Sequence, residues 1–105
     1  MSRSITCLLL LVTLSTGVQA QEMTDRQRQM WSRSCALCHV SGEAFAPRIG
    51  HPEEWRARLD KGMDVLLTHT LEGLDRMPPL GYCMGCEEAD FAAMITFMAM
   101  PQVSP

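Results

Sequence analysis

The chain has 105 residues, of which 47% are hydrophobic and 20% are charged, and its formal net charge at pH 7 is −3. This length allows one small domain, whose core is modest enough that a cofactor or a disulfide is expected to add stability. The acidic balance argues against nucleic-acid binding, which requires a basic face.

The first twenty residues have the pattern of a secretory signal peptide. Arg3 precedes an apolar run over residues 5–14, and Val18-Gln19-Ala20 ends on a small residue. The run is too short for a stable membrane span, which disfavours a retained anchor. We therefore predict that residues 1–20, with Cys7, are removed and that residues 21–105 form a periplasmic domain without membrane insertion. Eight Lys and Arg would then face twelve Asp and Glu, a formal charge of −4.

A helix is predicted over residues 24–34. Thr24 and Gln27 have the spacing of a capping box, in which each residue satisfies a backbone N–H group of the other. Met30 and Trp31 would lie on one side of this helix.

The next five residues, Cys35-Ala36-Leu37-Cys38-His39, have the spacing of a covalent attachment site for a c-type haem. Two thiols three positions apart can each bond a vinyl group on one haem edge, and the adjacent imidazole can ligate the iron. Cys-x-x-Cys by itself also occurs in zinc, disulfide and redox sites, and the following His39 favours haem. We expect one covalently attached haem c held by Cys35, Cys38 and His39.

The remaining elements are also helical, and no segment shows strand alternation. Pro47 and Gly50 mark a loop, after which helices are predicted over residues 52–59 and 63–72, with Gly73 as a stop. A last helix over residues 87–98 carries an apolar stripe at i, i+3, i+4 and i+7, namely Phe91, Met94, Ile95 and Met98. The predicted fold is all-α, with about four helices packed around the haem.

A haem in such a protein needs a second axial ligand from the chain unless it binds substrates, and three methionines are candidates. Met63 begins a helix and could equally be core, and Met84 lies in the tight ring between Cys83 and Cys86. Met77 precedes Pro78-Pro79, whose fixed φ stiffens the backbone around a weakly ligating thioether. We expect Met77 to be the ligand; a packing role in the loop is the alternative.

The four mature thiols form two Cys-x-x-Cys pairs, which could also suggest a four-thiolate zinc site. However, 44 residues separate the pairs, against roughly 15–20 in that site, and His39 would have no role. A thioredoxin-like site would need strand–helix alternation around the first pair. A haem at the first pair and a disulfide at the second account for all four thiols.

The chain resembles the small bacterial class I cytochromes c, most closely the cytochrome c5 group. The resemblance covers roughly residues 24–98 and rests on Cys35 to His39 and on residues 46–50, 62–67 and 74–86. Its most specific mark is the Met77-Pro78-Pro79 loop followed closely by Cys83-x-x-Cys86.

The resemblance implies roles for particular residues. Met77 would be the axial ligand opposite His39, and Cys83 and Cys86 would form a disulfide. The carbonyl of Pro47 would accept the N–H of His39, which orients the imidazole and raises its basicity. Leu80 stands where the group often has Lys, which removes a charge near the haem edge and leaves an inherited partner surface in question.

Three functions fit these features. The first is a diffusible periplasmic carrier of single electrons between redox protein partners, monomeric or weakly dimeric and not itself an enzyme. The second is a haem relay subunit held permanently by a periplasmic dehydrogenase. The third is a gas sensor or peroxidase from which Met77 departs.

The remaining aromatic, aliphatic and histidine residues of interest are expected to pack or to face solvent. We expect Trp31, Leu66, Phe91 and Ile95 to surround the haem, and Trp55 to pack in the core or the haem pocket. His51 and His69 lack a partner at ligand spacing and are expected to face solvent or pack.

Overall fold

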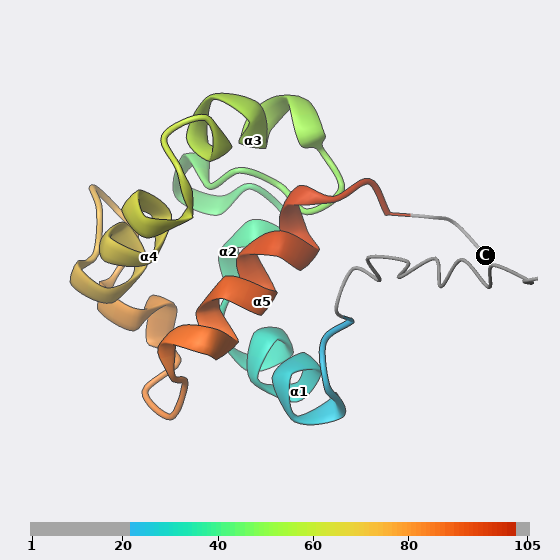
Figure 1. Ribbon diagram of the computed structural model, residues 1–105, viewed down its shortest axis with the longest axis vertical. Helices are drawn as coiled ribbons and strands as arrows, with labels where there is room; N and C mark the ends of the chain where they lie inside the picture. The colour runs from blue at the N-terminus through green and yellow to red at the C-terminus, as the bar shows by residue number, and fades with distance from the viewer. Residues whose placement is uncertain (1–21, 103–105) are drawn as a thin grey trace, which may run out of the picture.

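The computed structural model describes residues 22–102, and within them the chain is all-α (Figure 1). The predicted signal peptide and its cleavage position lie outside this range. The elements are α1 (Asp25–Arg33), α2 (Ala36–His39), η1 (Glu43–Phe45), α3 (Pro52–Leu59), α4 (Met63–Glu72), η2 (Pro79–Tyr82) and α5 (Glu88–Ala99), where η denotes a 3-10 helix. In the described residues the sole strand-like pairing is an isolated bridge between Leu74 and Met77. No helix there is long and apolar enough to cross a membrane.

The four predicted helices are confirmed to within one residue at each end. At α1 the capping box is complete: Thr24 Oγ1 accepts the Gln27 N–H at 3.1 Å, and Gln27 Oε1 accepts the Thr24 N–H at 2.9 Å. Gly62 and Gly73 flank α4 with positive φ, backbone conformations that favour glycine. Local capping and stop signals therefore set most of the helix boundaries.

Helix α5 supplies the centre of the core. Figure 1 shows α5 between α1 and α4, and it packs against both. The predicted stripe is confirmed, because Phe91, Met94, Ile95 and Met98 are all buried. Full burial of a large apolar side chain contributes roughly 1.5–3 kcal/mol, so this stripe is a main source of stability.

The short helix α2 and the two 3-10 helices were not predicted. Helix α2 has four residues, too few to show a helical period in the sequence. It packs against α1 and contains Cys38 and His39. The haem motif is therefore a helical turn whose orientation is fixed by packing against α1.

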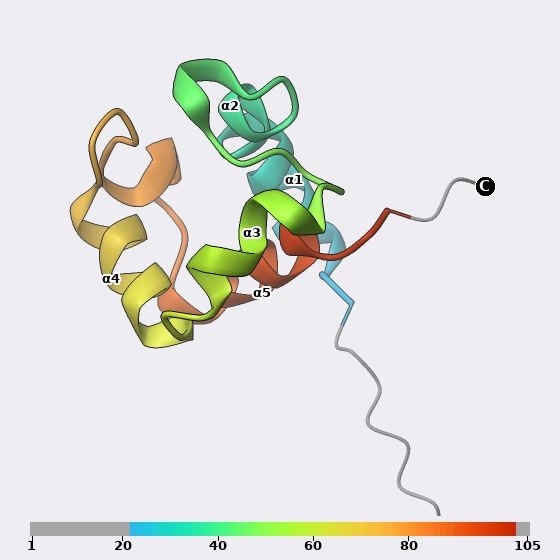
Figure 2. The same cartoon turned by 90° about the horizontal axis from the view of Figure 1, so that it is seen from above.

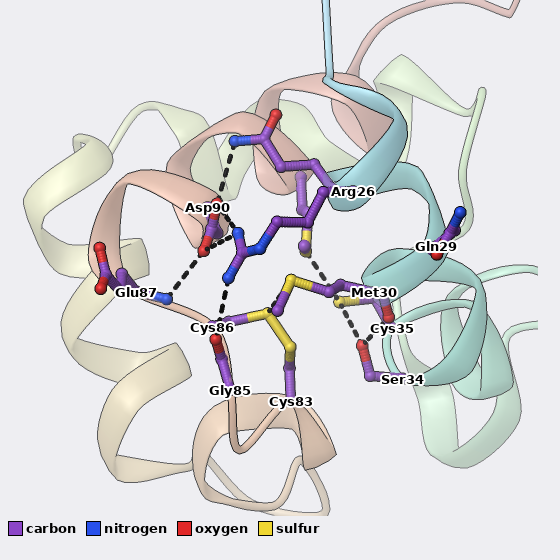
Figure 3. Close-up of a disulfide and its surroundings, with 12 residues drawn as sticks. Arg26, Gln29, Met30, Ser34, Cys35, Cys83, Gly85, Cys86, Glu87 and Asp90 are labelled. Carbon is purple, nitrogen blue, oxygen red and sulfur yellow. Dashed lines mark hydrogen bonds and ion pairs between the residues drawn. A yellow bond between two sulfur atoms is a disulfide. The ribbon is translucent and has the colours of Figure 1, made fainter.

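A buried carboxylate joins α1 to the start of α5 (Figure 3). Asp90 accepts hydrogen bonds from the backbone N–H of Glu87 at 3.0 Å, from Arg26 Nη1 at 3.0 and 3.1 Å, and from Gln27 Nε2 at 3.1 Å. The Glu87 N–H, followed by Arg26 and Gln27, lowers the pKa of Asp90. Asp90 thus caps its own helix and also holds α1 in place.

The turn that contains Cys83 and Cys86 is attached to the same region of α1 (Figure 3). The structure bonds the two sulfur atoms to each other. Arg26 Nη2 donates to the carbonyl of Gly85 at 3.2 Å, and Cys86 Sγ lies 3.7 Å from Met30 Sδ. The turn is therefore fixed to α1 by both a polar and a sulfur contact.

We predict that Asp90→Asn lowers the free energy of unfolding by about 1 kcal/mol at neutral pH, since it weakens a helix cap and an ion pair. The folded-state pKa of Asp90 is depressed, so its contribution is present above the ordinary aspartate pKa and is lost as the pH falls through the lower folded value. Denaturant unfolding from pH 7 down to pH 3 should show the deficit shrinking below about pH 4.

The matched control for this prediction is Glu88→Gln, which removes a charge from the first turn of the same helix but from an exposed residue. A deficit of equal size in both variants, or one independent of pH, would contradict the role assigned to Asp90.

Candidate functional site

His39 lies at the end of α2 and is held by the segment that follows it. Its side chain is buried, and Nδ1 lies 2.7 Å from the carbonyl oxygen of Pro47, the contact that the family resemblance implies. The backbone carbonyl of His39 also accepts the N–H of Ile49 at 2.7 Å. With Nδ1–H donating to Pro47, Nε2 keeps its lone pair and can ligate a metal.

Burial also favours the neutral imidazole that ligation requires. Desolvation is the main cause that lowers the pKa of His39; the Pro47 contact opposes it and the charge of Arg58 adds to it. Trp55 is buried beside His39, with the two rings stacked at 5.5 Å and 26°. The indole Nε1 donates to the carbonyl of Arg48 at 2.9 Å, so Trp55 is itself fixed. The packing role of Trp55 is confirmed, and stacking on His39 is an addition to it.

The two cysteines of the motif lie one helical turn apart. Cys35 is buried and Cys38 is half-buried, and neither is bonded to another cysteine. Side chains three residues apart on a helix face the same side, so the two sulfur atoms can meet one edge of a ligand.

Met77 reaches the site from the connection between α4 and η2. Leu74 and Met77 exchange backbone hydrogen bonds at 3.0 and 2.8 Å around the two-residue turn formed by Asp75 and Arg76. Gly81 lies beside the Met77 side chain, since a Cβ at that position would be at an ordinary contact distance, 3.4 Å, from Met77 Cε. The backbone on both sides of Met77 is therefore closely restrained.

The other methionine candidates are elsewhere. Met63 packs against the core cluster, and the side chain of Met84 is 80% exposed. Neither lines the cavity described next.

A cavity of about 620 Å³ brings the predicted residues together. Cys35, Cys38, His39 and Pro47 line one part of it, and Met77 lines another. Figure 2 shows the segment of α2 and η1 set apart from the loop that follows α4. The volume lies within the range of small-molecule cofactor sites. Two thiols, an imidazole and a thioether in one cavity of this size fit a covalently held haem.

The apolar residues that line the cavity are only partly those predicted to surround the haem. Leu66 and Ile95 line the cavity as predicted, together with Met98. The predictions for Trp31 and Phe91 were wrong, since neither lines it. Phe91 is buried in the core one helical turn before Ile95, and Trp31 packs edge-on against Phe97 at 5.3 Å. In α5 the cavity is lined by Ile95 and Met98, whereas Asp90 near the start of the helix and Phe97 near its end contact α1.

Several residues that line the cavity were not identified from the sequence. They are cationic or aromatic side chains, and all but the half-buried His69 are exposed: Phe45, Arg58, Lys61, His69, Arg76 and Tyr82. The i, i+3 spacing of Trp55 and Arg58 is a signal that could have placed Arg58 on the same helix face. Cys83, Cys86 and His51 do not line the cavity; His51 lies 3.0 Å from Glu53 at the start of α3.

This is a helical domain in which a Cys-x-x-Cys-His motif and a Met distant in sequence line the same cavity. That combination is typical of a c-type haem protein. The family model described as cytochrome c oxidase, cbb3-type, subunit III matches residues 22–98. Cytochrome c5 of Azotobacter vinelandii is 37% identical over 70 residues, covering 65% of this chain and 84% of that protein. Cytochrome c5 of Ectopseudomonas mendocina is 33% identical over 70 residues, covering 65% and 80%.

Solved structures agree with the sequence relatives. A mono-haem ferrocytochrome c from Shewanella putrefaciens has a TM-score of 0.65 and 34% identity, covering 78% of this chain and 100% of that one. A chain from the crystal structure of an electron transfer complex of nitrite reductase with cytochrome c has a TM-score of 0.65 and 32% identity, covering 74% and 95%. The chain therefore belongs to the cytochrome c family. Within that family it is a small class I monohaem cytochrome c. It is a haem-based electron carrier with one covalently attached c-type haem.

We predict that Gly73→Ala disturbs the Met77 loop. Gly73 has φ +85° and ψ 157°, a region used almost only by glycine, and an added Cβ would lie 3.0 Å from the Met77 carbonyl oxygen and the Pro79 nitrogen. The expected result is a stability loss of about 1–3 kcal/mol together with weakening of the near-infrared sulfur-to-iron band of the oxidised protein.

Gly62→Ala is the matched control. Gly62 has a similar backbone, φ +96° and ψ 152°, but nothing lies within 4 Å of its added Cβ. This variant should lose stability while keeping the near-infrared band. An unchanged band in Gly73→Ala would show that the loop does not depend on close approach at Gly73.

Proposed function

We propose that this cytochrome is a diffusible periplasmic carrier of single electrons in which His39 and Met77 are the two axial ligands of the haem iron. The observation that carries the proposal is the placement of His39 and Met77 in one cavity, each on a segment with a restrained backbone. With both His39 and Met77 bound to the iron, no coordination position would remain for a substrate. This arrangement favours electron transfer over catalysis at the iron.

The haem, when bound, supplies an iron that gains and loses one electron. The chain determines how the two ligands are held and how well water is excluded. Pro47 holds His39 in the tautomer that presents Nε2. The Leu74–Met77 bridge and the following prolines restrain a thioether, which is a weak ligand and needs a fixed position. Leu66, Ile95 and Met98 form an apolar wall that excludes water. His/Met ligation together with apolar burial favours the reduced state and raises the potential.

The disulfide between Cys83 and Cys86 completes this arrangement. It closes a very short loop, so its effect on the unfolded chain is worth about 2 kcal/mol. It begins directly after η2, and η2 packs against α4. We propose that it holds the end of the Met77 loop against α1 and carries no redox function.

Redox proteins in the periplasm are the proposed partners. The related structure of a nitrite reductase complex with cytochrome c supports a periplasmic reductase as one class of acceptor. A second candidate is a relay subunit bound permanently to a larger enzyme, which would cover apolar side chains that are exposed here, such as Leu37, Val40 and Tyr82. Affinity capture from periplasm with mass spectrometry tests both: a carrier should be recovered mostly alone with weak partners, and a relay subunit with a stoichiometric larger chain.

We predict that the oxidised protein shows the weak near-infrared sulfur-to-iron band and that Met77→Ala abolishes it, because Met77 would supply the only thioether ligand. Met84→Ala, at an exposed position outside the cavity, should keep the band and serves as the control. Persistence of the band in Met77→Ala would remove Met77 as ligand. Carbon monoxide binding by the ferrous wild-type protein would instead favour the gas sensor or peroxidase.

A second prediction concerns processing and the thiols. The exported protein should have the mass of residues 21–105 plus one haem, and thiol counting after unfolding should find no free thiol. The reason is that Cys35 and Cys38 would be bonded to haem and Cys83 and Cys86 to each other. Two reactive thiols would contradict the disulfide, and a larger mass would contradict cleavage after Ala20.

A further inference from the structure

We infer that Arg76 and Phe45 form a clasp across the mouth of the haem cavity and that this clasp positions the Met77 loop. The Arg76 guanidinium carbon lies 5.2 Å from the centroid of the Phe45 ring, within the range of a cation–π contact. Both residues line the cavity, and they belong to different segments. The inference rests on the proposed ligation by Met77.

One end of the clasp is attached to the Met77 ligand. Arg76 is adjacent to Met77 and lies inside the two-residue turn that the Leu74–Met77 bridge closes. Asp75, the other residue of this turn, has φ +52°, so the turn is tight and sharply bent. The position of the Arg76 side chain is therefore coupled to that of Met77 through a rigid turn.

The other end belongs to the His39 side of the site. Phe45 lies two residues before Pro47, whose carbonyl contacts His39. Ala44 and Phe45 have φ of +53° and +65°, a left-handed conformation that is unfavourable for non-glycine residues. The ring is also 84% exposed, so burial does not compensate for that cost. The contact with Arg76 offsets part of that cost.

The clasp therefore links the two loops that carry the axial ligands, on the solvent side of the cavity. Neither clasp residue belongs to the core cluster, so the clasp is a restraint separate from the packing of α4 and α5. Movement of the Met77 loop away from the cavity would separate Arg76 from Phe45 and so break the clasp. The contact reduces the population of the state in which Met77 is not bound to iron. An added ligand can bind only in that state, so its apparent affinity falls by the same factor as the population.

The test is an imidazole titration of the ferric holoprotein at pH 8, where imidazole is mostly neutral and the loss of a protein charge has little direct effect on it. Phe45→Leu and Arg76→Gln should each tighten imidazole binding about two- to fivefold, the range for an exposed cation–π contact. The double variant should bind no more tightly than either single variant, because both remove one shared interaction. Phe45→Tyr, which keeps the aromatic face, should remain close to wild type.

Arg56→Gln is the charge control, since Arg56 is exposed, does not line the cavity and carries the same charge as Arg76. It should bind imidazole as wild type does. Single-variant effects no larger than that of Arg56→Gln, or effects that multiply in the double variant, would overturn the clasp. Near-infrared spectra of each variant separate the two proposals. A wild-type protein without the sulfur-to-iron band overturns the Met77 ligation and the clasp with it, whereas a present band with unchanged imidazole binding overturns the clasp alone.

Discussion

The hydrogen bond between His39 Nδ1 and the carbonyl of Pro47, at 2.7 Å, is the interaction on which the site depends. It selects the tautomer that leaves Nε2 for iron, and it uses a backbone carbonyl, which keeps its position whatever side chain is present. The same short segment also donates the Ile49 N–H to the His39 carbonyl and accepts the Trp55 indole N–H at Arg48. Three consecutive residues thus restrain the imidazole, its backbone and the ring stacked on it.

Met77 is held by a different means, because a thioether offers no second polar atom to orient it. Its position depends on the backbone: the bridge with Leu74, the glycine at 73 that permits close approach, and the prolines that follow. The restraint continues through η2 to the Cys83–Cys86 turn, which Arg26 connects to α1. Helix α5 packs against both α1 and α4 and so fixes their positions relative to each other.

Most of the helices could be predicted because their signals are local. The Thr24–Gln27 box, Pro52 at a helix start and Gly73 at a helix end each act through neighbouring backbone groups. Helix α2 is too short to carry a period, and the positive φ of Phe45 has no signature in residue type. The placement of Trp31 and Phe91 around the haem was wrong because an apolar residue on a helix can face either the core or the cavity, and periodicity does not distinguish them.

The sequence by itself determined that this chain carries a c-type haem, since covalent attachment requires Cys-x-x-Cys-His at fixed spacing, and it indicated Met77 through the rigid prolines beside it. It also determined the helical class, because capping and apolar periodicity are local properties. The tertiary structure alone decided which side chains meet across the cavity. Arg76 reaches Phe45 across 30 residues of intervening chain, and Trp55 stacks on His39, because α3, α4 and α5 fold around the site. Such contacts depend on the relative orientation of whole helices, which is set by packing throughout the core and has no local signal.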